Sequence, residues 1–271
     1  MNEFYYSYQG SKRTEIKNII QNLDLSKYDT IVEPFGGSLA FSRYVFNLYP
    51  NKNYLISDVD PELTQFCNNF HKDKQNILNQ TIKDINSIEN KQQYKEYLKN
   101  KPGINDAGFM SWNLFTKKYR GVQEGLYPIP GQRSKPKFVK YMEKTAKTDE
   151  FFKKLEYKKQ PFNIYLEQVK NDSKSLVFLD PPYMFLNNEN YYKFNIREIY
   201  EYLLEYFKNC KCDYIFVHEY QFIMNYLFGE NIVNIYDKQY YNTKFKASRG
   251  KYEKHNVQHC VISNIPKKDF L

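Results

Sequence analysis

The chain reads Leu176-Val177-Phe178-Leu179-Asp180-Pro181-Pro182-Tyr183, in which four apolar residues lead directly into a carboxylate, two prolines and an aromatic ring. The apolar run predicts a buried strand, and the end of such a strand lies at the carboxyl edge of a sheet, where α/β proteins bind ligands. The four residues after the strand also fit an ordinary turn, because Asp and Pro are common in turns. The rest of the chain must decide between these interpretations.

Short apolar runs alternate with helical stretches on both sides of this segment. The expected strands are 30–32, 54–56, 176–179, 214–217, 232–235 and 257–263. One expected helix begins near Ser11, one follows Pro61, and the others cover 38–49, 196–208 and 222–228. Strand and helix alternation with this spacing predicts an α/β fold with a Rossmann-like, doubly wound, mainly parallel sheet.

The alternation stops between the two halves. Residues 73–100 are polar with a helical pattern, and residues 101–140 are rich in Gly, Pro, basic and aromatic residues. We interpret 73–160 as an inserted subdomain, with 1–72 and 161–271 forming one catalytic domain. A long ordered loop is the alternative.

The composition limits the classes of protein. Lys and Arg number 40 against 31 Asp and Glu, and the net charge of +9 favours a polyanionic partner. A low-GC coding bias, visible in the many Asn, Ile and Tyr, also enriches Lys and weakens that argument. No apolar stretch approaches the roughly 18 residues of a membrane span, and four scattered cysteines indicate neither a disulfide framework nor a zinc site. We expect a soluble, intracellular protein without a metal or a membrane contact.

The chemistry of Asp180-Pro181-Pro182-Tyr183 suits a planar group that carries an amino nitrogen. The lone pair of such a nitrogen is delocalised, so an enzyme that alkylates it must draw the nitrogen toward tetrahedral geometry. The Asp180 carboxylate and the Pro181 carbonyl can accept its two N–H bonds, while the prolines fix the backbone and Tyr183 stacks on the ring. We therefore name all four residues, Pro182 included, as candidate catalytic residues.

A glycine turn follows the first predicted strand and opens a helix, in the sequence Glu33-Pro34-Phe35-Gly36-Gly37-Ser38. Its glycines allow close approach of a ligand to the backbone. About 20 residues later, Asp58 ends the second strand, where an acidic side chain binds both hydroxyls of a ribose. The turn matches neither the dinucleotide nor the triphosphate glycine pattern, so S-adenosylmethionine, which has no phosphates, is the cofactor that fits.

Four blocks resemble the D12 class of Dam-like DNA N6-adenine methyltransferases: Tyr8-Gln9-Gly10-Ser11-Lys12, Glu33-Pro34-Phe35-Gly36-Gly37-Ser38, Ser57-Asp58 and Asp180-Pro181-Pro182-Tyr183. The resemblance implies a methyltransferase fold in which S-adenosylmethionine methylates an adenine flipped out of double-stranded DNA and is released as S-adenosylhomocysteine. It implies a set of cofactor-binding residues, which are Tyr8, Gly10, Lys12, Glu33, Phe35, Gly36, Gly37, Ser38 and Asp58.

The resemblance also implies that the insert is a target-recognition region. The candidate DNA-binding residues are Lys12, Lys117, Lys118, Arg120, Arg133 and Arg249, since arginine reads guanine and lysine mostly contacts phosphates. A cognate restriction endonuclease is a possible partner for such an enzyme, and a phage is a possible source. The oligomeric state, like the recognised sequence, does not follow from the chain.

Two positions depart from the family pattern. The segment Phe162-Asn163-Ile164-Tyr165 lacks the acidic residue that usually precedes the catalytic strand, and His218 stands where a serine is common. A structural role is the expectation for His218 and Glu219.

Three other functions stay open on the residues alone. They are methylation of cytosine N4, methylation of a glutamine side-chain amide and a catalytically silent DNA-binding module. The long interval between Phe35 and Asp180 argues against the glutamine enzyme, because it leaves room for a base-reading subdomain. The joint presence of Asp180, Tyr183 and Asp58 argues against a silent module.

Overall fold

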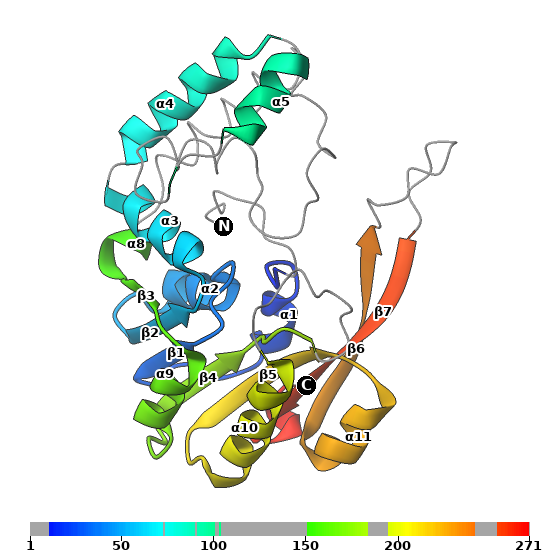
Figure 1. Cartoon of the computed structure of the whole chain (residues 1–271). Coiled ribbons are helices and arrows are strands. Elements are labelled where there is room, and N and C mark those ends of the chain that lie inside the picture. Colours follow the sequence, from blue (N-terminus) through cyan, green and yellow to red (C-terminus); the bar gives the residue numbers. More distant parts are fainter. Residues whose placement is uncertain are drawn as a thin grey trace.

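A seven-stranded sheet forms the centre of the molecule (Figure 1). The computed structural model describes residues 11–72, 74–89, 91–100, 103, 151–183, 195–241 and 254–270. The strands are β1 (Thr30–Glu33), β2 (Asn53–Asp58), β3 (Tyr157–Lys159), β4 (Ser175–Leu179), β5 (Asp213–Glu219), β6 (Ile232–Tyr241) and β7 (Lys254–Ser263). The helices are α1 (Ile16–Ile20), α2 (Ala40–Leu48), α3 (Pro61–Lys72), α4 (Lys74–Ser87), α5 (Lys91–Lys99), α8 (Phe151–Lys154), α9 (Phe162–Val169), α10 (Ile196–Asn209) and α11 (Phe222–Phe228), with the short 3-10 turns η1 (Gly229–Asn231) and η2 (Lys267–Asp269).

The strand order is β3-β2-β1-β4-β5-β7-β6, and the first five strands run parallel. Strand β7 is inserted antiparallel between β5 and β6. This is a mixed α/β architecture with a mostly parallel sheet, consistent with the fold of the methyltransferases that depend on S-adenosylmethionine. The prediction of the fold class is confirmed.

The central strand β4 shows why the sheet is covered on both faces. All five of its residues are buried, and successive side chains of a strand point to opposite faces. Leu176 and Phe178 join one apolar cluster with side chains of α1, α2 and α3, while Val177 and Leu179 join the other with side chains of α9, α10 and α11. The doubly wound arrangement thus follows from an uninterrupted apolar run in the sequence.

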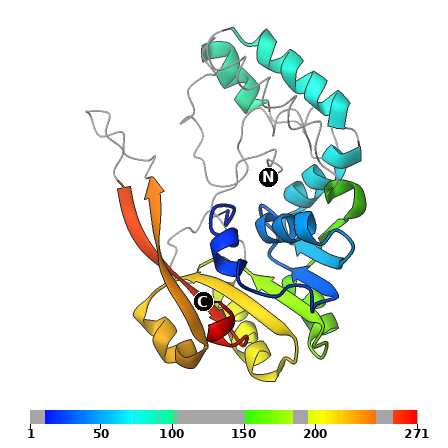
Figure 2. The same ribbon diagram turned by 180° about the vertical axis from the view of Figure 1, so that it is seen from behind.

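Two parts of the chain project from this core on opposite sides, as both views show (Figures 1 and 2). On one side are α4 and α5, which were predicted as polar helices. On the other side, β5 pairs with β7 only as far as His259. Strands β6 and β7 continue to pair with each other beyond that point, up to the pair Tyr241 and Lys254. The hairpin therefore overhangs the carboxyl edge of the parallel strands.

The structure places one strand where the sequence predicted none. Strand β3 pairs with the end of β2, and Phe151 of α8 is buried in the core that contains α2 and α3. Both elements fall in the range 73–160 that the sequence assigns to the insert, so the sheet takes in part of that range. The signal was missing because only Tyr157 of β3 is buried, while its two lysines face solvent. Within the described residues, no helix is long and apolar enough to span a membrane.

Candidate active site

The three predicted site segments end neighbouring parallel strands. Strand β1 lies between β2 and β4, and the glycine turn (residues 33–38), Asp58 and residues 180–183 each lie at the end of one of these strands. Parallel strands have their carboxyl ends at one edge, so the sheet brings together segments that are far apart in the sequence.

The glycine turn is held tightly against β2 and β3. The Gly36 amide donates to the Ser57 carbonyl over 2.9 Å, and the Gly37 amide donates to Asp58 Oδ2 over 3.1 Å. A Cβ atom on Gly36 would lie 2.5 Å from the Tyr157 hydroxyl oxygen, and Gly37 has a φ of 44°. Each position thus requires glycine for a different reason. A side chain at Gly36 would clash with Tyr157, and the backbone at Gly37 has a conformation that other residues rarely adopt.

Asp58 links the turn to the second strand. Its Oδ1 accepts a hydrogen bond from the Asp60 amide over 2.9 Å in addition to the bond from Gly37. Asp58 therefore stabilises the turn besides being the predicted ribose ligand.

Two polar atoms beside Asp58 fit a ligand at this edge. Ser57 Oγ and Gln160 Nε2 are buried, and neither has a hydrogen-bond partner among the residues that the structure describes. Gln160 follows β3 directly, and its backbone amide donates to the backbone carbonyl of Asp58 over 3.1 Å. Leaving a buried donor unpaired costs about 1–3 kcal/mol, which a polar nucleoside ligand would offset.

Glu33 and Phe35 stabilise the turn from within the protein. The buried Glu33 carboxylate accepts a bond from the Ser42 amide over 2.9 Å, and burial raises the pKa of Glu33 to about 8 although that bond opposes the shift. The Phe35 ring stacks on Phe162 of α9 with ring centroids 4.9 Å apart. The next predicted residue, Ser38, bonds the Ser11 hydroxyl over 2.8 Å and so ties the turn to the segment before α1.

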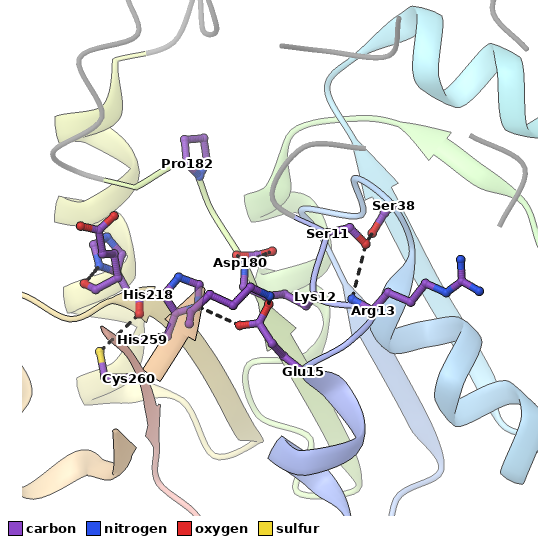
Figure 3. A network of polar contacts seen from close by, with 12 residues as sticks. Ser11, Lys12, Arg13, Glu15, Ser38, Asp180, Pro182, His218, His259 and Cys260 are labelled. Carbon is purple, nitrogen blue, oxygen red and sulfur yellow. Dashed lines mark hydrogen bonds and ion pairs between the residues drawn. The ribbon is translucent and has the colours of Figure 1, made fainter. Parts of the chain in front are cut away.

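Lys12 and Asp180 form an ion pair at the centre of the site (Figure 3). The Lys12 ammonium lies 2.7 Å and 2.8 Å from the two carboxylate oxygens, although 168 residues separate the partners. Lys12 is 2% exposed, whereas the Asp180 side chain keeps 22% of its surface exposed. Burial raises the pKa of Asp180, and the positive charge of Lys12 opposes that rise.

The backbone of the Asp-Pro-Pro-Tyr segment is fixed by α10. The Tyr200 hydroxyl donates to the Pro182 carbonyl over 3.0 Å. No donor to the Pro181 carbonyl is found in the described part of the chain, which is compatible with its predicted role as an acceptor. The Tyr183 ring is largely buried, with its centroid 4.7 Å from that of His218. His218, for which we expected a structural role, is therefore in contact with a candidate catalytic residue.

Sequence reasoning missed two residues of this site, Glu15 and His259. Both are buried, and His259 Nδ1 lies 2.8 Å from Glu15 Oε2 across 244 residues of sequence (Figure 3). The only available signal was the position of Glu15 one helical turn after Lys12. Several candidates lie outside the described residues, namely Tyr8, Gly10, Lys117, Lys118, Arg120, Arg133 and Arg249.

Comparison with known proteins decides the family. A model of the D12 class N6 adenine-specific DNA methyltransferases matches residues 8–252. The chain belongs to this family. The match spans all four sequence blocks, and the D12 family accounts for the order of glycine turn, Asp58 and Asp-Pro-Pro-Tyr along the chain.

Two curated relatives agree with this assignment. The chain is 26% identical over 266 residues to the type II methyltransferase M.CviBI of Paramecium bursaria Chlorella virus NC1A, which covers 95% of this chain and 97% of the relative. It is 24% identical over 210 residues to the type II methyltransferase M.MjaIII of Methanocaldococcus jannaschii, covering 68% and 70%. This D12-class protein is a DNA methyltransferase, so the predicted enzyme class is confirmed, and its family implies DNA as substrate and a bound methyl donor.

Proposed function

We propose that this enzyme transfers the methyl group of S-adenosylmethionine to the N6 amino group of an adenine flipped out of a specific site in double-stranded DNA. The contact between Lys12 and Asp180 carries the proposal. It places a nitrogen that carries N–H donors within 2.7–2.8 Å of both oxygens of Asp180, at the end of β4. The Lys12 ammonium thus donates to the Asp180 carboxylate as the exocyclic amino group of a base would.

In the proposed reaction, the amino group of adenine displaces Lys12 from at least one oxygen of Asp180. One N–H then donates to Asp180 and the other to the Pro181 carbonyl, which draws the N6 lone pair out of conjugation with the ring. With S-adenosylmethionine bound, N6 would form a bond to the methyl carbon; the carbon–sulfur bond would break, and the electron pair of that bond would stay on sulfur. N6 then loses one proton, for which the Asp180 carboxylate is an acceptor.

The cofactor residues proposed from the sequence fit a nucleoside at the ends of β1 and β2. S-adenosylmethionine, when bound, supplies an activated methyl group on a sulfonium. The carboxylate of Asp58 and the unpartnered atoms of Ser57 and Gln160 support binding of its nucleoside part.

DNA would meet the carboxyl edge of the sheet between the two projecting parts of the molecule. Flipping the base costs a few kcal/mol, and stacking on Tyr183 with hydrogen bonds to the base edge would offset that cost. Arg120, Arg133, Lys117, Lys118 and Arg249 stay candidates for contacts with bases and phosphates. The relatives are named type II methyltransferases, which supports recognition of a specific site and a cognate restriction endonuclease as a partner.

The variant Asp180→Asn tests the role of the carboxylate. It removes the charge while it preserves shape, so S-adenosylmethionine affinity measured by calorimetry should stay near that of the wild type. Methyl transfer to DNA should fall by at least about 100-fold, as for loss of one preorganised electrostatic contact. The exposed Asp24→Asn serves as the matched control. Transfer that survives in Asp180→Asn would refute the assigned role.

A further inference from the structure

The Tyr183 ring is surrounded by side chains from three separate parts of the chain. The centroid of the His218 ring, on β5, lies 4.7 Å from that of Tyr183. The His259 ring, on β7, is nearly perpendicular to the Tyr183 ring, with the centroids 5.6 Å apart. The Lys12 ammonium lies 5.1 Å from the centroid of the same ring. Tyr183 follows two prolines and keeps 9% exposure, so these neighbours define where its ring can lie.

His259 is oriented by a buried carboxylate. Glu15, just before α1, accepts hydrogen bonds from His259 Nδ1 over 2.8 Å, from the Tyr236 hydroxyl over 2.7 Å and from the Lys238 ammonium. Burial alone raises the pKa of Glu15, but the bonds from His259 and Lys238 outweigh it and lower the pKa to about 2. Glu15 is therefore ionised at neutral pH and can only accept, so Nδ1 of His259 is the donor in their hydrogen bond.

The second histidine is fixed in a different way. His218 Nδ1 lies 2.6 Å from the Glu219 carbonyl, which can only accept, so Nδ1 carries the proton. Burial lowers the pKa of His218 to about 4, so the ring is neutral at pH 7. Tyr183 thus contacts two imidazole rings, and a hydrogen bond at Nδ1 of each ring sets its orientation.

We propose that Glu15 and His259 are positioning residues, which hold the Tyr183 ring in the orientation that receives the target base. This inference rests on the proposed function, and it assigns a role to two residues outside the predicted cofactor-binding and catalytic sets. A direct consequence concerns the overhanging hairpin. Tyr236 and Lys238 on β6 and His259 on β7 all bond Glu15, so the hairpin and the segment that carries Lys12 are joined at one carboxylate.

Two substitutions of His259 separate its two contacts. In His259→Asn the amide nitrogen can still donate to Glu15, but the ring edge against Tyr183 is lost. In His259→Phe the ring edge remains and the donor is lost, while Tyr236 and Lys238 still satisfy Glu15. The exposed Tyr226→Phe on α11 serves as a control, because its ring is 86% exposed.

The assay uses a duplex that carries the sequence methylated by the wild type, with 2-aminopurine in place of the target adenine for the binding measurement. The fluorescence of this base rises when it leaves the stack and is quenched when it stacks on tyrosine. For His259→Asn we expect a brighter bound duplex and a kcat/KM for unmodified DNA about two- to tenfold lower, the fold-change that corresponds to one aromatic edge contact. His259→Phe should lose less than His259→Asn, and Tyr226→Phe should match the wild type.

Four measurements on the variants decide the outcome: melting temperature, S-adenosylmethionine affinity, fluorescence of the bound base and kcat/KM. Melting temperature and S-adenosylmethionine affinity that stay at the wild-type value, together with the brighter bound base, support the proposal. Wild-type quenching and kcat/KM in both variants of His259 would overturn it. A parallel fall in stability and cofactor affinity would also overturn it, because the pair would then support the whole structure rather than the Tyr183 ring. Absence of methylation by the wild type would instead refute the proposed function.

Discussion

Replacing Gly36 by alanine tests the close packing of the cofactor turn on β3. The added Cβ would lie 2.5 Å, 2.7 Å and 2.8 Å from the hydroxyl oxygen, Cε2 and Cζ of Tyr157. Tyr157 cannot withdraw easily, because its ring is 2% exposed and its backbone amide and carbonyl are both bonded by Asn68. The turn must therefore move away from β3 by several tenths of an ångström.

The expected cost follows from overpacking, which destabilises proteins by about 1–3 kcal/mol. Gly36→Ala should lower the free energy of unfolding in urea by that amount, and the displaced turn should weaken S-adenosylmethionine binding measured by calorimetry. The variant Tyr157→Leu removes all three clashing atoms. In that background Gly36→Ala should cost less than about 0.5 kcal/mol, the usual range for a harmless substitution.

Gly229→Ala is the matched control, since no atom of the described residues outside its chain neighbours lies within 4 Å of the Cβ that it would add. Equal costs of Gly36→Ala in the wild type and in Tyr157→Leu would refute the steric reasoning. So would a neutral effect of Gly36→Ala on both unfolding and cofactor affinity.

Two further predictions concern charge. Lys12→Met removes the positive charge that opposes the rise in the pKa of Asp180, so the acidic limb of the pH profile of kcat should move to higher pH. The control Lys208→Met, at an exposed position, should leave the limb in place. An unmoved limb in Lys12→Met would contradict this. The pKa of Glu33 rises from 4.5 to about 8 on folding, so folding takes up a proton at pH values between these two. The contribution of Glu33 to the free energy of unfolding is therefore fully present below pH 4.5 and is lost as the pH rises toward 8. Urea unfolding across that window should therefore show a decline in the wild type that Glu33→Gln flattens, and parallel curves would show that Glu33 is not the group responsible.

The buried parallel strands were predictable because their apolar runs are continuous. Leu176 to Leu179 gave the central strand, and the structure extends it by only one residue, Ser175. The same signal located β1, β2 and β5. Strand β3 was not predicted, because it has three residues and only Tyr157 is buried.

The outer ends of β6 and β7 were also missed, for a different reason. Predictions ended β6 near Ile235 and began β7 near Val257, but the strands run to Tyr241 and from Lys254. Apart from Tyr236, these additional residues lie beyond the last pair that β5 makes with β7, so they need no buried apolar face. Without such a face, hydrophobic periodicity gives no signal.

The segments that meet at the candidate site were predictable where one strand end supplied a whole motif. Asp180 and Gly36 each belong to a local pattern with a chemical reason. The pairs Lys12 with Asp180 and Glu15 with His259 join residues 168 and 244 positions apart, and no local pattern links their partners. They arise only when the segment before α1 crosses the carboxyl edge of the sheet.

The identity of the methylated atom tests the central claim most directly. DNA incubated with the enzyme and S-adenosylmethionine labelled in its methyl group would be digested to nucleosides and separated by chromatography with mass detection. The account predicts label in N6-methyladenine, and its loss with Asp180→Asn but not with Asp24→Asn. Label in N4-methylcytosine, or on protein alone, would contradict it.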